Sequence, residues 1–282
     1  MVCAWDNFLQ ILPLWMRQDV NRLGRNDLQE LRLRLNMPPE LRCESGALRL
    51  FRKVTQSDMH FCINTASKYS PWLADTAKKG FITAPGGHRI GLCGTFRDNS
   101  GSITDIASVT SLCVRVARDF PGVSTGIPSY AMSVLILGRP GKGKTTLLRD
   151  MIRNRSENGN EHIAVVDERE EIFPRSNGEF CFYTGKNTDV LSGCNKSKGM
   201  DMVMRAMGPD TIAVDEITTM EDTQALLHAG WCGVNLLATA HASSCDDLKK
   251  RPVYRNIIDS QIFDAVVILD PDKSWHIERL KV

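Results

Sequence analysis

The sequence predicts a two-domain chain of the α/β class, in which a smaller α+β domain precedes a domain with a mostly parallel sheet. From Ala131 onward, short aliphatic runs alternate with helical patterns, which is typical of a parallel sheet covered by helices on both faces. Before that point, amphipathic helices mix with strands of period two. Loop residues follow Phe120, so the predicted domains are residues 1–122 and 123–282.

The composition is that of an ordinary globular protein, with 282 residues, 42% hydrophobic and 24% charged. A formal net charge of +2 gives no reason to expect nucleic acid or an anionic membrane surface as a partner. The nine cysteines never form a Cys-x-x-Cys pair, which favours reduced thiols in a cytosolic protein over a zinc site or disulfides. No apolar run approaches the length of a membrane span, so we expect membrane contact only through partner proteins.

The first domain is expected to combine short helices with strands. Residues 1–50 have the pattern of helical pieces, interrupted by one half-buried strand near residues 28–35. Two helices are expected within residues 57–79, and a hairpin with a Pro-Gly-Gly turn within residues 80–96. A last strand is expected at residues 112–117. This domain carries no chemical motif of its own.

The second domain is expected to alternate strands and helices. Its strands are expected at residues 134–137, 162–167, 211–215, 235–239, 265–269 and, as an edge strand, 275–280. Helices are expected between them, among them residues 145–155 and 199–207. In the second helix a stripe of methionines and valine (Met200, Val203, Met204, Met207) recurs at helical spacing, which is more typical of core than of a binding surface. Ligands of such sheets bind at the carboxyl ends of the strands.

A glycine-rich turn with the pattern Gly-x-x-x-x-Gly-Lys-Thr follows the first of these strands. Together with the next threonine, its residues are Gly138, Arg139, Pro140, Gly141, Lys142, Gly143, Lys144, Thr145 and Thr146. Backbone N–H groups of such a loop surround phosphates, Lys144 reaches the β- and γ-phosphates, and the Thr145 hydroxyl is a Mg²⁺ ligand. A chance glycine-rich turn is the alternative, but the strand before it and the helix after it favour a phosphate loop. The sequence therefore predicts a RecA-like P-loop NTPase domain that uses ATP and Mg²⁺.

Two adjacent carboxylates, Asp215 and Glu216, follow the aliphatic strand at residues 211–215. Asp215 is expected to hold Mg²⁺ through water, and Glu216 to polarise the attacking water. A strand that ends in an acidic loop is common by itself. Downstream of a phosphate loop, the glutamate directly after the aspartate favours hydrolysis over binding alone.

Two further strand ends carry polar groups. We expect the strand at residues 235–239 to lie between the two strands of the motifs above, so that Thr239 or His241 senses the γ-phosphate. A structural histidine is the alternative. Asp167 and Glu168 are expected to lie at the rim of the nucleotide site. Glu168 is the second candidate, after Glu216, for the general base of hydrolysis. A charged loop without a catalytic role is the alternative.

No arginine within these motifs points at the γ-phosphate, and ring ATPases often receive that charge from the neighbouring subunit. Arg205 is expected on the exposed side of its helix, away from the methionine stripe. Arg115 is expected on the strand face opposite Leu112, Val114 and Val116. Each arginine is a candidate for the shared site, and for each a solvated surface charge is the alternative.

Five blocks of the sequence together resemble the stage III sporulation protein AA family, and the resemblance covers nearly the whole chain. The blocks are residues 80–94, the phosphate loop, and residues 165–169, 188–194 and 238–244. That family is in turn similar to the hexameric secretion ATPases of type II, type IV and pilus systems. The acidic box and the histidine box of those ATPases match Asp167-Glu168 and His241 here.

The resemblance implies an ATP-hydrolysing, ring-forming motor of a secretion-like channel between mother cell and forespore. It implies other copies of the chain in a hexameric ring and membrane proteins of the sporulation channel as partners. It also implies a cytoplasmic location at the inner face of the mother-cell membrane. The alternatives are an ATP-switched structural scaffold of that channel and a RecA-like nucleic-acid motor. The near-neutral charge argues against the nucleic-acid motor, so we expect no nucleic acid as a partner.

Overall fold

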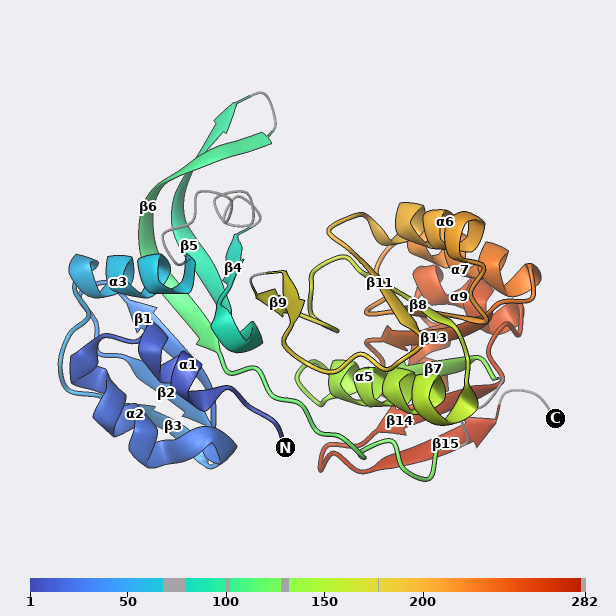
Figure 1. Ribbon diagram of the computed structural model, residues 1–282, viewed down its shortest axis with the longest axis horizontal. Helices are drawn as coiled ribbons and strands as arrows, with labels where there is room; N and C mark the ends of the chain where they lie inside the picture. The colour runs from blue at the N-terminus through green and yellow to red at the C-terminus, as the bar shows by residue number, and fades with distance from the viewer. Residues whose placement is uncertain (68–79, 100–101, 128–131, 177, 280–282) are drawn as a thin grey trace. The chain divides into compact units, whose positions relative to one another are not determined.

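The computed structural model (Figure 1) describes the chain except residues 68–79, 100–101, 128–131, 177 and 280–282. The chain forms two compact units, which we call unit 1 and unit 2. Unit 1 comprises residues 1–119 and 174–181, and unit 2 comprises residues 120–173 and 182–282. Residues 174–181 lie within the expected second domain (123–282), but in the structure they belong to unit 1.

Unit 1 is an antiparallel sheet with helices on one face (Figure 1). The strand order is β3-β2-β1-β6-β5-β4. The strands are β1 (Leu28–Arg34), β2 (Glu40–Cys43), β3 (Gly46–Arg49), β4 (Phe81–Thr83), β5 (Arg89–Asn99) and β6 (Ser102–Arg115). The helices are α1 (Trp5–Ile11), α2 (Leu14–Asp27), α3 (Gln56–Ser67) and the 3₁₀ turn η2 (Pro85–Gly87). The returning segment adds the strand pair β9 (Arg175–Ser176) and β10 (Glu179–Phe180).

Alternate residues of β1 contribute to the core of unit 1. Leu31 and Leu33 are buried beside the helices, and arginines occupy the positions that alternate with them. The predicted hairpin is confirmed, because β4 pairs antiparallel with β5 across η2. Residues 40–49 are strands β2 and β3, so the helical prediction for this stretch was wrong. Every residue of β3 is exposed, so no apolar alternation marks it as a strand. Of the two helices expected within residues 57–79, α3 is present, and residues 68–79 lie outside the described part.

Unit 2 contains a sheet of strand order β11-β8-β12-β13-β7-β14-β15. Neighbouring strands are parallel except for the antiparallel edge strand β15. The strands are β7 (Val134–Leu137), β8 (Ile163–Asp167), β11 (Thr188–Ser192), β12 (Thr211–Val214), β13 (Asn235–Ala240), β14 (Ala265–Leu269) and β15 (Trp275–Arg279). The helices are α5 (Lys144–Asn154), the π-helical turn η3 (Arg155–Gly159), α6 (Lys196–Met207), α7 (Met220–Trp231), α8 (Cys245–Lys249) and α9 (Pro252–Asp259). The predicted α/β class, with a mostly parallel sheet after an α+β region, is confirmed.

Helices cover both faces of this parallel sheet (Figure 1). On one face α6, α7 and α9 pack against alternate strand residues in a single hydrophobic cluster, while α5 lies on the other face. A strand that is buried on both faces has a continuous aliphatic sequence, and β7 is such a strand, because all four of its residues are buried. The methionine stripe of α6 is core at Met200 and Val203, but Met207 is 50% exposed. The core prediction was wrong for Met207 because this residue ends the helix just before the left-handed cap at Gly208.

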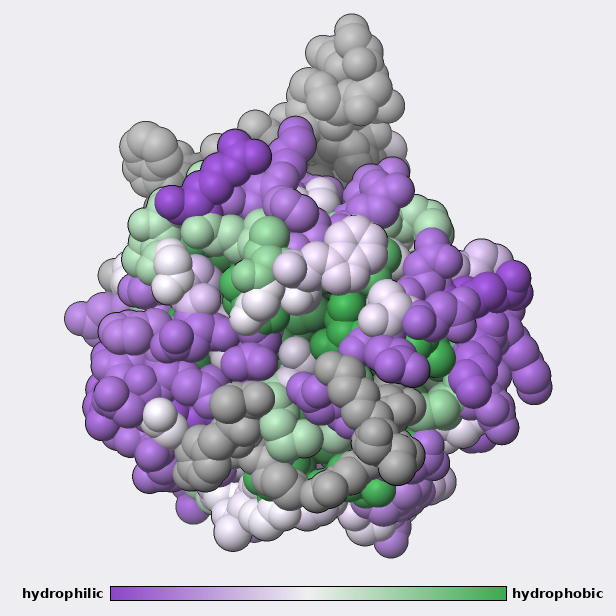
Figure 2. Space-filling model, turned by 90° about the vertical axis from the view of Figure 1, so that its right-hand side faces the viewer, coloured by the Kyte–Doolittle hydropathy of each residue, from purple (hydrophilic) through white to green (hydrophobic). Residues whose placement is uncertain are grey.

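The surface of the molecule is largely hydrophilic on the face that Figure 2 shows, with hydrophobic patches between charged side chains. None of the helices in the described ranges is long and apolar enough to cross a membrane.

His88 is a buried polar residue of unit 1, directly after the η2 turn. Its Nδ1 atom accepts a hydrogen bond from the backbone N–H of Ala117 at 3.1 Å. The proton therefore sits on Nε2, which donates to the carbonyl oxygen of Ala4 at 2.9 Å. Burial lowers the pKa of His88 from 6.5 to about 4, and the hydrogen bond to Ala4 opposes this only in part.

The neutral His88 should make unit 1 sensitive to acid. Between the ordinary pKa of 6.5 and the folded pKa of about 4, the unfolded chain binds a proton that the folded chain excludes. The free energy of unfolding should therefore fall by up to about 1.4 kcal/mol per pH unit as the pH drops through this window. The measurement is denaturant unfolding of the parent and of His88→Gln across the window.

His60→Gln is the matched control, because His60 is exposed on α3 in the same unit. The fall in the free energy of unfolding with decreasing pH should be smaller in His88→Gln than in the parent, and His60→Gln should keep the parental slope. An unchanged slope in His88→Gln would contradict the assignment.

Candidate nucleotide site

The phosphate loop joins the end of β7 to the start of α5. Gly141 and Gly143 adopt φ values of 74° and 98°, in the left-handed region that glycine enters without strain. At Gly138 a Cβ atom would lie 3.2 Å from the Cβ of Leu269, so a side chain would crowd the turn. The first turn of α5, which starts at Lys144, leaves backbone N–H groups without helical partners. The loop is therefore shaped to surround an anionic group at a helix N-terminus.

Lys144 is buried at this turn, with 6% of its surface exposed. Its ammonium donates to the carbonyl oxygen of Arg139 at 3.2 Å and to Nδ1 of His241 at 2.8 Å. Burial lowers the pKa of Lys144, and the charges of Asp215 and Glu216 act in the opposite direction. The ammonium therefore lies in a dry, carboxylate-rich environment.

His241 connects this lysine to the candidate base. Because Nδ1 accepts from the Lys144 ammonium, the ring proton lies on Nε2, which faces Oε1 of Glu216 at 3.0 Å. A neutral imidazole can make both contacts at once. Lys144, His241 and Glu216 are thus linked in sequence, by the Lys144–His241 hydrogen bond and by the 3.0 Å contact between His241 and Glu216.

The carboxylate of Asp215 joins the phosphate loop to two strand ends. Its Oδ2 accepts the hydroxyl of Thr145 at 2.8 Å, and its Oδ1 accepts the hydroxyl of Thr239 at 2.7 Å. Thr239 is fully buried and its oxygen also accepts the backbone N–H of Glu216 at 2.9 Å. Thr145 and Asp215 offer hard oxygen ligands beside the loop, so these residues fit a Mg²⁺ ion.

The strand order explains why these groups meet. β13 lies between β7 and β12, as predicted, so the parallel ends of all three strands reach the same edge of the sheet. β8 lies next to β12 in register, with Val166 opposite Val214. The carboxylates that follow these two valines are therefore neighbours at that edge.

Asp167 is engaged by its own loop. It accepts the backbone N–H groups of Glu171, Ile172 and Phe173 at 2.8, 3.0 and 2.8 Å. Burial raises its pKa to about 6, although these three hydrogen bonds act in the opposite direction. Glu168, the next residue, instead extends to Lys196, whose Nζ lies 3.1 Å from its Oε2.

These carboxylates surround a single small pocket. The pocket is lined by Val166, Asp167, Glu168, Arg169, Glu171, Lys196, Asp215, Glu216 and Thr218. Two cations of this pocket, Lys196 and Arg169, were not singled out from the sequence. Nothing in the local pattern marks Lys196, because a lysine at a helix start usually lies at the surface.

The two arginines that the sequence singled out lie outside this pocket lining. Arg205 is exposed on α6, as expected. Arg115 ends β6 of unit 1, where its side chain is 62% exposed and its Nε lies 3.9 Å from Glu30.

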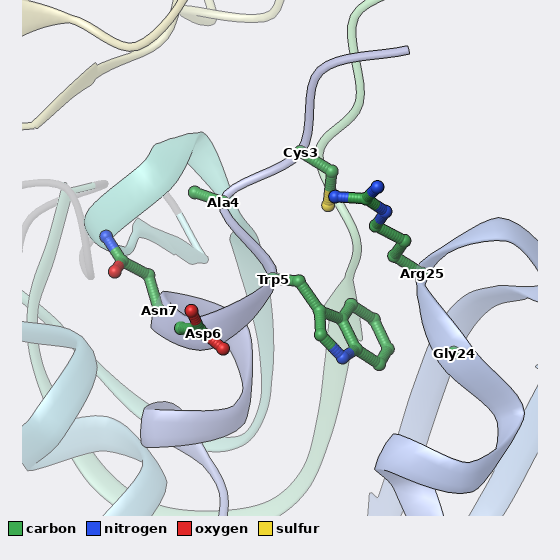
Figure 3. A pocket seen from close by; sticks show the side chains of 7 residues that line it. All are labelled: Cys3, Ala4, Trp5, Asp6, Asn7, Gly24 and Arg25. Atoms are coloured by element: carbon green, nitrogen blue, oxygen red, sulfur yellow. The ribbon is translucent and has the colours of Figure 1, made fainter.

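A second hollow lies in unit 1 beside the start of α1 (Figure 3). Its lining is Cys3, Ala4, Trp5, Asp6, Asn7, Gly24 and Arg25. The indole N–H of Trp5 already donates to Asn21 at 2.8 Å. None of the predicted site residues belongs to this lining, and its charged groups Asp6 and Arg25 are both exposed.

The parallel sheet with its phosphate loop defines a RecA-like ATPase fold, and similar solved structures have this fold. The X-ray structure of the Legionella pneumophila ATPase DotB matches with a TM-score of 0.60 and 17% identity, covering 95% of this chain and 80% of that one. The pilus retraction motor PilT with bound ADP matches with a TM-score of 0.61 and 15% identity, covering 92% and 80%. At these identities the likeness shows the fold alone.

Sequence relatives define the family. The family model "Sporulation stage III, protein AA" matches residues 5–277. Stage III sporulation protein AA of Bacillus subtilis (strain 168) is 34% identical over 282 residues, which cover 95% of this chain and 92% of that protein. Protein SEEDLING PLASTID DEVELOPMENT 1 of Arabidopsis thaliana is 28% identical over 271 residues, covering 90% of this chain but 36% of its own length. The chain belongs to the stage III sporulation protein AA family, and the resemblance noted from the sequence is confirmed.

Thr239 should be needed to orient the carboxylate of Asp215. Thr239→Val keeps the shape but removes one donor from Asp215 and one acceptor from the Glu216 N–H. The Mg²⁺-dependent part of ATP binding, measured by calorimetry with and without the metal, should weaken by about tenfold. Thr239→Ser, which keeps the hydroxyl, should retain most of the Mg²⁺-dependent ATP binding.

Thr223→Val is the matched control, because Thr223 is also fully buried and donates to the carbonyl oxygen of Val253 at 2.7 Å. Both valine variants should lose about 1–3 kcal/mol of stability, because each removes a buried hydrogen bond. If Thr223→Val weakened Mg²⁺-dependent binding as much as Thr239→Val, the specific role of Thr239 would be refuted.

Proposed function

We propose that this chain is an ATP-hydrolysing, ring-forming motor of a secretion-like channel in sporulation. One observation carries the proposal: the phosphate loop, the Thr145–Asp215 pair and Glu216 meet at one edge of the sheet, and His241 links Glu216 to Lys144. Membership of a sporulation family supports the biological setting.

Each residue has a role that its position supports. The loop backbone and Lys144 would bind the phosphates of ATP, and Thr145 with Asp215 would hold Mg²⁺, which neutralises phosphate charge when bound. Glu216 would accept the proton of the attacking water. His241 would hold that carboxylate through its Nε2 proton and, at the end of β13, would respond to a γ-phosphate that draws Lys144 away from it.

We further propose that the chain works as a homo-oligomeric, hexameric ring attached to membrane proteins of the sporulation channel, at the inner face of the mother-cell membrane. Support for a ring comes from Arg205, an exposed cation on α6, and from Met202, which lies three residues earlier on the same helix and is 54% exposed. An exposed methionine beside an arginine is a composition that protein interfaces favour. Arg115 on unit 1 is the second candidate for a charge shared between copies.

Glu216→Gln should separate ATP binding from turnover. The amide keeps the size of the side chain but cannot take a proton, and loss of a general base lowers rates by about 10²–10⁴-fold. ATP affinity by calorimetry should stay near that of the parent, whereas phosphate release should fall. Lys144→Ala is the contrasting variant, since it should abolish binding itself.

Two results would redirect the proposal. A Glu216→Gln variant that releases phosphate at the parental rate would exclude Glu216 as the base. A parent chain that binds ATP but does not turn it over would leave the ATP-switched scaffold as the better description.

Arg205→Ala should lower turnover by removing a charge supplied to the neighbouring copy, for which a factor of about 10³ is typical. Mixing Arg205→Ala with Glu216→Gln, each nearly inactive alone, should restore part of the activity at mixed interfaces. Activity per copy should also rise with protein concentration. Arg115→Ala in the same mixture tests the second candidate.

Arg255→Ala is the control, because Arg255 is exposed on α9 of the same unit and should retain parental activity. Activity per copy that stays constant across a demonstrated monomer–oligomer transition would rule out a shared site.

A further inference from the structure

Lys196 places a buried ammonium in the carboxylate pocket. It is the first residue of α6, and 8% of its side chain is exposed. It lines the same pocket as Asp215 and Glu216. Removing an ammonium from water costs several kcal/mol, and a buried ion pair rarely gains stability over apolar packing. Stability therefore gives no reason for a lysine at this position.

Two carboxylates lie near the Lys196 ammonium, and they are not equivalent. Oδ2 of Asp222 is 3.9 Å away, which is beyond hydrogen-bond distance. That oxygen already accepts the backbone N–H groups of Thr218 and Thr219 at 3.0 and 3.1 Å, closing the capping box of α7. Oε2 of Glu168 lies at 3.1 Å, and within the described ranges Lys196 is the hydrogen-bond donor found for this carboxylate. The ammonium therefore holds Glu168.

The position of Glu168 mirrors that of Glu216. β8 and β12 are parallel with Val166 opposite Val214, so each glutamate is the second residue after a paired valine. Both glutamates line the pocket. Asp167 cannot serve in the same way, because three backbone N–H groups of its own loop occupy its oxygens.

We infer that Lys196 is a positioning residue for hydrolysis, which holds Glu168 against the pocket so that Glu168 and Glu216 together orient the attacking water. The inference rests on the proposed ATP hydrolysis. In that step the water oxygen bonds to the γ-phosphorus, and the bond from phosphorus to the bridging oxygen breaks. The electron pair of that bond leaves with ADP, and the water proton passes to Glu216, while Glu168 accepts the second hydrogen bond of the water.

The test compares Lys196→Met with Lys198→Met, a control two residues further along α6 whose side chain is exposed. Lys196→Met should lower kcat by about tenfold or more, since small misplacements of a catalytic group cost up to about 10²-fold. ATP affinity by calorimetry should stay within about twofold of the parent. Lys196→Arg should restore most of the rate, and Lys198→Met should match the parent.

The decisive measurement is the same substitution in a Glu168→Gln background. If Lys196 acts through Glu168, Lys196→Met should not lower kcat any further in the Glu168→Gln background. An equal loss in both backgrounds would overturn the inference, because Lys196 would then act through Asp222 or the fold. A large loss of ATP affinity would also overturn it, because the ammonium would then bind nucleotide directly.

Thermal unfolding of each variant guards against a folding defect. If Lys196→Met is unfolded, Lys196→Gln replaces it in the parent and in the Glu168→Gln background, and the same outcomes support or overturn the inference. A parent chain without turnover would overturn the proposed function and this inference together. A parent with turnover and a Lys196→Met variant at the parental rate would overturn this inference alone.

Discussion

The hydrogen bonds to the Asp215 carboxylate are the contacts on which the candidate site depends. Thr145 and Thr239 donate to its two oxygens, so the phosphate loop, β13 and the end of β12 are fixed to one another. The Thr239 hydroxyl also accepts the N–H of Glu216, which has a positive φ of 32°. A non-glycine residue keeps such a conformation only where its surroundings enforce it. The backbone of the candidate base is therefore held both by a threonine on the neighbouring strand and by the Asp215 carboxylate, which accepts the same N–H at 3.0 Å.

In the proposed function, the contacts of Lys144 would couple ATP binding to hydrolysis within one chain. The ammonium is buried and donates to His241, whose other nitrogen faces Glu216. A phosphate that attracts this ammonium competes with the imidazole for it. Loss of that donor would free the Nδ1 atom of His241 and change how the ring holds Glu216. In the proposed function, one histidine would thus report on the phosphate and adjust the base.

Sequence patterns predicted what depends on periodicity and spacing. β7 and β14 have the predicted bounds because strands buried on both faces are continuous aliphatic runs. The edge strand β3 was missed because its residues are all exposed and its pairing is a property of the backbone. The Lys196–Glu168 contact could not be predicted either, since it joins the residue that follows β8 to the first residue of α6, which only the packed helix brings together. Periodicity assigns faces, whereas a contact requires the tertiary structure.

The pairs Asp167-Glu168 and Asp215-Glu216 are the same dipeptide at neighbouring strand ends, and their surroundings give them different roles. Three backbone N–H groups hold Asp167, and burial raises its pKa to about 6, so it is suited to stabilise a loop. Asp215 is held by two hydroxyls that leave it beside the phosphate loop, where the proposed function requires a metal ligand. Glu216 lies 3.0 Å from Nε2 of His241, whereas Glu168 accepts a hydrogen bond from Lys196. The donors around each carboxylate, more than the motif it belongs to, determine its chemistry.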